Sequence, residues 1–171
     1  LAGWGTRAVA AMRQAGIPAV VNERDGYFEA QEIQLLLSLL QIIDNPEQDL
    51  PMAAVLHSGL VGLDANELGA LRLTRDGSLW SVMPLYAEQA QDKRLLQFIA
   101  HIERWRTLSR RHGVADLLWD VYETLDYVNY VGAMPNGLVR RANVMALYER
   151  AKGFESSGFR GLFRFLRKLT R

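Results

Sequence analysis

The segment from residue 28 to residue 44 constrains the fold of this chain more than any other. Its polar residues recur at helical spacing and form one narrow stripe, which consists of Gln31, Gln34, Ser38 and Gln41. The remaining positions from Ile33 to Ile43 are apolar. A helix with so narrow a polar face must be buried on most of its sides. We therefore predict a largely buried helix over residues 28–44, which Asn45-Pro46 is expected to end.

Further helices are predicted along the rest of the chain, with short connections between them. Apolar periodicity and turn signals delimit them to residues 6–15, 50–57, 65–73, 78–89, 92–111, 114–125, 138–154 and 157–169. Asp49 is expected to cap the helix that follows it, and Asp64 and Glu67 have the spacing of a capping box. Pro84 is expected to kink or split its helix near Met83.

One short β element is predicted as well. Residues 17–21 follow Gly16, are apolar with several β-branched side chains, and are expected to form a strand. Asp25-Gly26 is expected to be a turn, and residues 127–134 fit either a short helix or a loop. The predicted fold class is mostly α: a helical array with a short β element of the kind found in α/β domains.

The net charge of +1 over 171 residues conceals a strong asymmetry. Residues 1–131 contain 11 Lys or Arg and 17 Asp or Glu, which gives −6. Residues 132–171 contain 9 Lys or Arg and 2 Asp or Glu, which gives +7. The chain therefore has an acidic body and a basic tail.

The basic tail is the main candidate for a binding surface. In its last helix, four arginines recur at helical spacing with Lys168 beside them, opposite an apolar stripe of Phe159, Leu162, Phe163, Leu166 and Leu169. The candidate phosphate contacts are Arg140, Arg141, Arg160, Arg164, Arg167 and Lys168. Such a face can bind nucleic acid because it releases counterions from phosphates. It can also be a solvated face, pair with the acidic body, or meet an acidic membrane surface.

No catalytic, cofactor or metal site is predicted within this chain. The sequence contains neither the glycine-rich phosphate-binding motifs nor the common hydrolase and zinc-protease motifs. It has no Cys, and its three His (His57, His101 and His112) are scattered. Glu29 and Glu32 are interpreted as charges favoured at a helix N-terminus, and His57 as a helix C-terminal residue.

The chain begins at Leu1, so we expect it to be a piece of a longer protein. We expect neither a signal peptide nor a membrane anchor, because no basic segment precedes an apolar one and the apolar residues 35–43 are too short to cross a bilayer. The lack of Cys fits a reducing cytoplasm.

Several segments resemble the superfamily 1 UvrD/Rep-type helicases, and more closely the AddA-type members of ATP-dependent helicase/nucleases. The first group is Gly26 to Ile33, Leu39 to Pro46 and Gln48 to Ser58. The second group is Tyr130 to Gly137, Arg141 to Tyr148 and Ser157 to Leu166. None of these segments is catalytic, so the resemblance rests on their order and spacing over nearly the whole chain.

The resemblance implies a place for this chain within a larger motor. Residues 1–45 would be the edge of a RecA-like 2A motor domain, and residues 46–171 a helical 2B-like insertion domain. The parent would be a bacterial, cytoplasmic, ATP-dependent helicase/exonuclease acting in double-strand break repair. It would use ATP and Mg, while this segment would hold no cofactor.

Two functions remain open from the sequence. One is a non-catalytic accessory domain that positions duplex or forked DNA without regard to sequence. The alternative is a helical protein-interaction module that docks an AddB-like partner protein or the remaining AddA domains. That alternative predicts an exposed apolar patch including Trp80, Tyr86 and Trp119.

Overall fold

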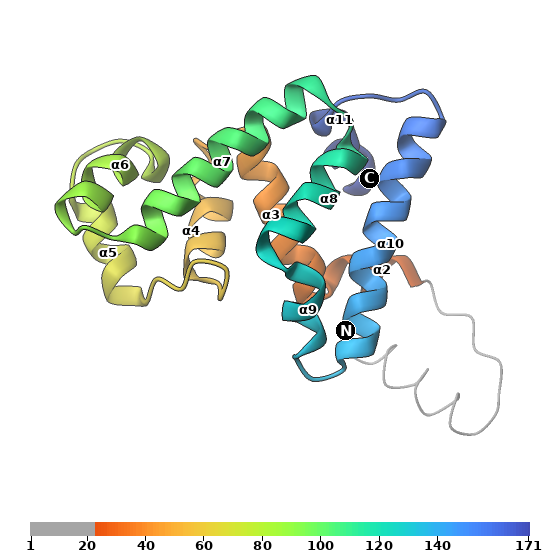
Figure 1. Cartoon of the computed structure of the whole chain (residues 1–171), viewed down its shortest axis with the longest axis horizontal. Helices are drawn as coiled ribbons and strands as arrows, with labels where there is room; N and C mark the ends of the chain where they lie inside the picture. The colour runs from red at the N-terminus through yellow and green to blue at the C-terminus, as the bar shows by residue number, and fades with distance from the viewer. Residues whose placement is uncertain (1–22) are drawn as a thin grey trace.

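The computed structural model describes residues 23–171, and this part of the chain is a helical array without strands (Figure 1). Its helices, in chain order, are α2 (Glu23–Glu29), α3 (Gln31–Asp44), α4 (Asp49–His57), α5 (Ala65–Leu73), α6 (Leu79–Gln89), α7 (Lys93–Arg111), α8 (Val114–Leu125), α9 (Tyr127–Gly132), α10 (Gly137–Ser156) and α11 (Leu162–Leu169). The mostly α fold class is therefore confirmed. The helix expected over residues 6–15 and the strand expected over residues 17–21 lie outside the described residues.

Helix α3 lies at the centre of the array, as its narrow polar stripe predicts. It packs against α2, α4, α7, α10 and α11. Its buried apolar side chains are Ile33, Leu36, Leu37, Leu39, Leu40, Ile42 and Ile43. Because α3 is covered by helices from both halves of the chain, it joins them into one hydrophobic core.

The other helices form two groups on either side of this centre. Helices α4, α5 and α6 lie at one end of the long axis, whereas α8, α9, α10 and α11 lie at the other (Figure 1). The 19-residue helix α7 runs from the first group to the second and packs against α3, α6 and α8. No helix in residues 23–171 is long and apolar enough to cross a membrane.

The turn expected at Asp25-Gly26 is wrong, and the helix expected over residues 78–89 is not split at Pro84. The turn expected at Asp25-Gly26 lies inside α2, where Tyr27 packs on the core and its hydroxyl donates to the Asn143 carbonyl at 2.9 Å. Helix α6 continues through Pro84, because buried residues on both sides of the proline hold the two halves on the same core. Of the two alternatives for the segment after residue 126, the helix is correct: α9 begins at Tyr127, which is fully buried.

Of the two helix caps predicted from the sequence, one is present in the structure and the other is not. The Asp64–Glu67 capping box of α5 is present with both of its hydrogen bonds. The prediction that Asp49 caps α4 is wrong, because α4 begins at Asp49 itself. Its carboxylate instead accepts from the Leu79 backbone N–H at 2.9 Å, at the start of α6. A residue far away in sequence thus satisfies a donor that the beginning of a helix leaves unpaired.

Candidate nucleic-acid interface

The six predicted phosphate contacts lie on two helices and the connection between them. Arg140 and Arg141 are in the first turns of α10, whereas Arg164, Arg167 and Lys168 are on α11. Arg160 lies in the connection, because α11 begins at Leu162 and not at Ser157 as predicted. All of these except Arg140 are exposed residues.

Arg140 differs from the other five because protein acceptors occupy its guanidinium group. Its Nη1 lies 3.0 Å from a carboxylate oxygen of Glu32, and its Nε donates to the Pro135 carbonyl at 2.8 Å. Only 21% of its side chain is exposed. Arg140 therefore ties α10 to the centre of the array and has little guanidinium surface left for another ligand.

Glu32 is a structural carboxylate that sequence analysis missed. It lies in the first turn of α3, as its interpretation as an N-terminal charge requires, but it is only 4% exposed. Besides Arg140, its carboxylate accepts from the side-chain amide of Asn143 at 2.8 Å. Its backbone carbonyl accepts from the Tyr127 hydroxyl at 2.6 Å. The signal that could have revealed it is its spacing, since residue 32 lies on the same face of α3 as the buried Leu36, Leu39 and Ile43.

The connection between α10 and α11 is shaped by two glycines. Gly158 has φ +85° and Gly161 has φ +94°, a backbone region that side chains disfavour. They flank Phe159 and Arg160, and both of these residues lie in the connection and not on a helix. The chain thereby turns back toward α3, against which α11 packs.

The apolar stripe predicted for the last helix is partly wrong. Leu162, Phe165 and Leu166 are buried, but Phe163 is 58% exposed. The guanidinium of Arg167 lies 5.7 Å from the centre of the Phe163 ring, and the Lys168 ammonium lies 4.3 Å from the Phe159 ring. Cations held over aromatic rings lose less freedom on binding an anion, and each such contact is worth roughly 0.5–1 kcal/mol when exposed.

The five exposed cations of the candidate interface have no carboxylate partner among residues 26–171. None of Arg141, Arg160, Arg164, Arg167 and Lys168 forms an ion pair there. Arg141 lies apart from the other four, because its side chain is beside Gly132 of α9 near the start of α10, whereas Arg160 follows the end of that helix.

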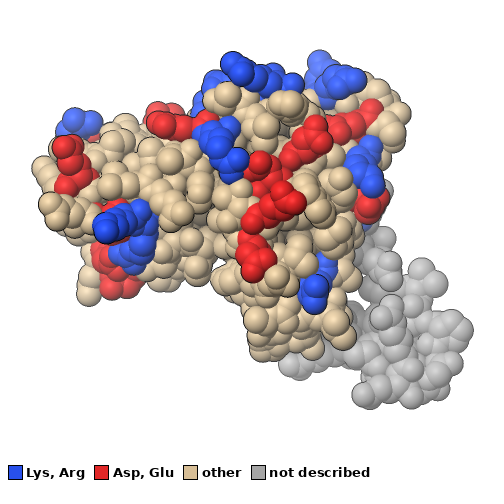
Figure 2. Space-filling view, in the orientation of Figure 1, with Lys and Arg blue, Asp and Glu red and all other residues tan. Residues whose placement is uncertain are grey.

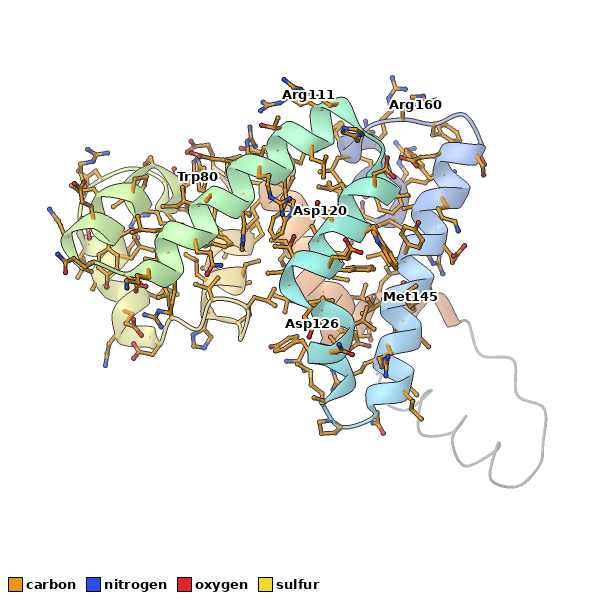
Figure 3. The ribbon with its side chains drawn as sticks, viewed as in Figure 1. Trp80, Arg111, Asp120, Asp126, Met145 and Arg160 are labelled. Atoms are coloured by element: carbon orange, nitrogen blue, oxygen red, sulfur yellow. The ribbon has the colours of Figure 1, made fainter. Side chains whose placement is uncertain are left out.

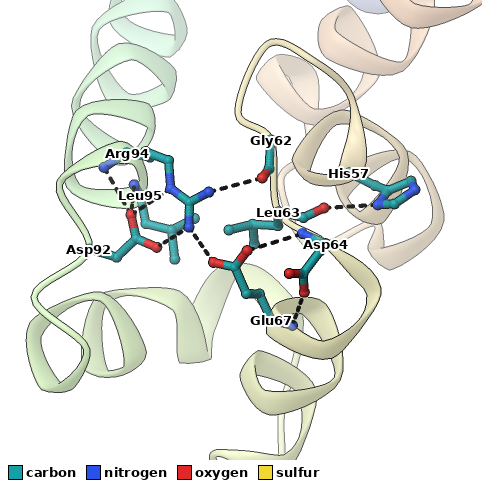
Figure 4. A network of polar contacts seen from close by, with 8 residues as sticks. All are labelled: His57, Gly62, Leu63, Asp64, Glu67, Asp92, Arg94 and Leu95. Carbon is teal, nitrogen blue, oxygen red and sulfur yellow. Dashed lines mark hydrogen bonds and ion pairs between the residues drawn. The ribbon is translucent and has the colours of Figure 1, made fainter.

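Several cations of the acidic part, in contrast, are paired. The guanidinium of Arg94 binds the carboxylates of Asp92 and Glu67 and donates to the Gly62 carbonyl at 2.9 Å (Figure 4). The hydrogen bond from Arg94 holds the pKa of Asp92 below its usual range. Arg94 thus joins the start of α7 to α5 and the loop before it.

Arg104 makes a second such contact. It binds both carboxylate oxygens of Asp120, at 2.7 and 3.1 Å. Burial alone would raise the pKa of Asp120. The hydrogen bonds from Trp105 and Arg104 and the charge of Arg104 outweigh burial, so its pKa is lowered.

Two further cations join the basic tail in space although they belong to the acidic body in sequence. Arg110 and Arg111 are exposed in the last turn of α7. That end of α7 lies near the end of α10, because the Glu155 carboxylate accepts from the Val114 backbone N–H. Arg111 and Arg160 project from the same edge of the molecule (Figure 3), where blue surface gathers in Figure 2. Because nearly 50 positions separate them, no local pattern could place them together.

The exposed patch predicted from Trp80, Tyr86 and Trp119 does not form. Trp80 and Tyr86 lie on α6 and are half-buried against the core. Trp119 lies on α8, at the other end of the array, and is 43% exposed. Its ring packs against Tyr148, with the ring centres 5.3 Å apart.

The His, Asp and Glu side chains of the described residues form no group of the size that binds a metal ion. No group of three or more His, Asp or Glu in residues 23–171 could hold a metal ion. His57 ends α4 and its Nδ1 lies 2.8 Å from the Leu63 carbonyl.

Comparison with known proteins identifies what the chain is similar to. No protein-family model matches the chain. It is 44% identical over 174 residues to the AddA protein of the ATP-dependent helicase/nuclease from Bacillus pumilus. It is 48% identical over 158 residues to the protein of the same name from Desulforudis audaxviator.

These alignments cover most of the chain but little of each relative. They include 98% and 91% of this chain, and only 14% and 13% of the two relatives. The Bacillus licheniformis protein of the same name gives the same coverage as the first, 98% and 14%, at 42% identity. The chain therefore is AddA-like, and it corresponds to about one seventh of the AddA protein of an ATP-dependent helicase/nuclease.

Proposed function

We propose that this chain is a non-catalytic accessory segment that positions DNA for an AddA-like helicase/nuclease. The observation that carries the proposal is the basic edge, which we define as Arg110, Arg111, Arg160, Arg164, Arg167 and Lys168. Except for the two α7 arginines, these are residues that the sequence predicts as phosphate contacts. The four of them on α11 and in the connection before it form no ion pair with a carboxylate of residues 26–171.

The chemistry of these side chains fits a contact with phosphates and not with bases. Arginine binds phosphate oxygens through two parallel N–H donors. Contacts to phosphates fix the position of a protein on DNA but carry no information about sequence. A motor that moves along DNA needs such contacts, because they must work at every step. The basic edge would therefore bind duplex or forked DNA regardless of sequence.

The activity of the whole protein is part of the same proposal. The relatives are named as components of an ATP-dependent helicase/nuclease, and we propose that the parent unwinds and degrades DNA during double-strand break repair in the bacterial cytoplasm. ATP and Mg would bind outside this segment, in the motor domains. Residues 1–45 would border the 2A motor domain, and residues 46–171 would form the 2B-like insertion. The parent would act together with an AddB-like partner protein.

The proposal is tested by DNA binding as a function of salt. The chain is titrated into labelled duplex and forked DNA, and fluorescence anisotropy gives the binding constant K. We expect log K to fall linearly with log salt, with a slope of about −0.9 for each phosphate contacted. Reversing Arg164 and Arg167 to Glu is expected to weaken binding to all sequences alike, with a slope shallower by about 1 per lost contact.

A matched double variant controls for total charge. Arg75→Glu with Lys93→Glu removes the same charge from two exposed positions, one in the loop before α6 and one at the start of α7. It should bind DNA nearly as the unmodified chain does. Direct DNA contact by this chain is ruled out if binding is absent at about 50 mM salt, a concentration at which phosphate contacts are strong. It is also ruled out if the two double variants lose the same affinity.

A further inference from the structure

A groove of about 700 Å³ lies between α2, α3, α10 and α11, and the DNA proposal does not account for most of it. Its floor is apolar and includes Leu37, Phe154 and Phe165, which are buried. Its rim carries Arg150, Lys168 and Arg171, all exposed. None of its lining residues in the range 26–171 is Asp or Glu. Its volume is within the range of sites that hold a ligand or several side chains, roughly 300–1,000 Å³.

Aromatic rings hold two of the rim cations in place. The Arg150 guanidinium lies 4.8 Å from the centre of the Tyr27 ring and 5.3 Å from that of Phe28. The Lys168 ammonium lies over Phe159 and, at 5.9 Å, over Phe154. Within residues 26–171, none of Arg150, Lys168 and Arg171 pairs with a carboxylate. The rim therefore presents fixed positive charge to whatever enters the groove.

The floor favours a protein occupant over a nucleic acid. Single-stranded nucleic acid binds where aromatic faces are open for bases to stack. Phe154 is 4% exposed and Phe165 is 1% exposed, so their faces are already covered. An apolar floor with a charged rim instead matches an amphipathic helix, which buries its apolar face in a groove. Because the rim is cationic, charge complementarity requires acidic residues along the flank of that helix.

The rest of a longer polypeptide can supply such a helix. The alignments leave about six sevenths of each relative outside this chain. Residues 1–22 do not match the groove in charge, because they contain Arg7 and Arg13 and no Asp or Glu. We propose that the groove binds an acidic amphipathic helix from the part of an AddA-like protein that lies beyond this chain. This inference concerns protein docking, so it stands or falls independently of the DNA contact.

Gly153 offers a way to close the groove without disturbing the fold. It lines the groove from α10, is exposed, and a Cβ built on it would meet no atom within 4 Å. Gly153→Phe would therefore fill the groove, in a helix where residues with a side chain are preferred to glycine. Gly69 on α5 is the matched control, because it is also exposed, helical and free of neighbours within 4 Å.

The experiment measures binding of peptides to the full 171-residue chain. The probes are overlapping peptides of about 20 residues, long enough for a helix of several turns, from the part of the Bacillus pumilus relative outside the alignment. We expect the peptides that bind to be acidic and amphipathic. Gly153→Phe and Arg150→Glu are each expected to weaken that binding at least about tenfold, which equals about 1.4 kcal/mol. Gly69→Phe and Lys93→Glu should leave it unchanged.

Other outcomes overturn the proposal. It fails if no peptide binds, or if binding is the same in Gly153→Phe and Gly69→Phe. It also fails if the groove variants lose only binding of an oligodeoxythymidine strand, which would make the groove a nucleic-acid site, or only self-association in sedimentation, which would make it a contact between two copies. Circular dichroism checks folding, and Arg150→Glu keeps the test valid should Gly153→Phe not fold. Duplex DNA binding by Gly153→Phe, expected to be unchanged, separates this result from the DNA proposal.

Discussion

Glu32 is the residue on which the contacts between distant parts of the chain converge. Its carboxylate binds Arg140 and Asn143 from α10, and its carbonyl binds Tyr127 from α9. A buried carboxylate is tolerated only when its charge is paired and its oxygens accept hydrogen bonds. Here both conditions are met, and no buried side-chain N or O atom in the described region lacks a partner.

Removal of the Glu32 carboxylate is expected to destabilise the fold strongly. Glu32→Ala leaves the half-buried guanidinium of Arg140 without its counter-ion, and breaking a buried pair in this way costs about 3–5 kcal/mol. The exposed Glu29 is the control, and Glu29→Ala should change stability by less than about 0.5 kcal/mol. Urea unfolding followed by circular dichroism gives both values. Equal stability of the two variants would contradict the role assigned to Glu32.

The sequence indicates that Glu32 lies at the start of a helix, but it does not indicate which residues the Glu32 carboxylate contacts. Its position at the start of a predicted buried helix was readable from the spacing of the polar stripe. Its partner Arg140 lies 108 residues away and reads as one more cation of a basic tail. The same limit applies to Arg106, whose guanidinium donates to the Ile43 and Asp44 carbonyls at the end of α3. Pairings across such separations depend on which helix faces meet, and local patterns do not contain that information.

Helix boundaries show the corresponding limit at the level of elements. Residues 114–125 form a helix with the predicted bounds, and the predicted helix over 92–111 differs only in that Asp92 serves as its N-cap. Local signals decide those ends. The last helix begins five residues later than predicted, because Gly158 and Gly161 adopt positive φ. A periodic apolar pattern extends across both glycines and conceals the break.

The cap of α7 should make stability depend on pH in the acid range. Asp92 accepts from the Arg94 and Leu95 backbone N–H groups and binds the Arg94 guanidinium. Its pKa is lowered in the folded state, chiefly by the hydrogen bond from Arg94. Since the unfolded value is about 3.9, the carboxylate contributes stability above about pH 4. That contribution is lost as the pH falls through the lower folded pKa.

Asp92→Asn isolates this charge, because Asn caps a helix as well as Asp does. The variant is expected to be less stable than the unmodified chain at pH 7, by up to about 1 kcal/mol for an ion pair with an exposed arginine. The difference should vanish in strong acid. Thermal unfolding between pH 2 and pH 7 measures it, with Asp76→Asn at an exposed position as the control. A difference that persists unchanged at the lowest pH would show that the charge is not its cause.

At the scale of the whole molecule, one core joins both groups of helices. The buried apolar residues form a single cluster that extends from Ile33 of α3 to Leu166 of α11 and includes Met52 of α4 and Val82 of α6. Helix α7 is packed against both groups. A continuous core of this kind favours cooperative unfolding.

The described region is therefore expected to unfold in one transition. In differential scanning calorimetry, the calorimetric and van't Hoff enthalpies should agree. Two transitions, with α4, α5 and α6 melting separately, would show that the polar contacts of Arg94 with Glu67 and Gly62 do not hold that group to the rest. Hydrogen exchange would then give faster exchange in those three helices than in α3.

The architecture as a class was predictable, whereas the assembly of the binding surface was not. Apolar periodicity indicated a helical array, and charge counting indicated a basic tail. The basic edge, however, also includes Arg110 and Arg111 from the end of α7, because the Glu155–Val114 contact brings that end to α10. It excludes Arg140, which Glu32 holds. The composition of the tail thus predicted a positively charged surface, whereas the packing of the helices determines which residues belong to it.

The separation of charge along the chain has a consequence for how the molecule would approach a polyanion. With a net charge of only +1, its attraction to distant DNA is weak. Cations gathered at one edge nevertheless give the molecule an electric dipole. The field of a nucleic acid would exert a torque on that dipole within a Debye length, about 10 Å at 0.1 M salt. The molecule would then rotate its basic edge toward the DNA before any contact forms, so that it is already oriented when it binds.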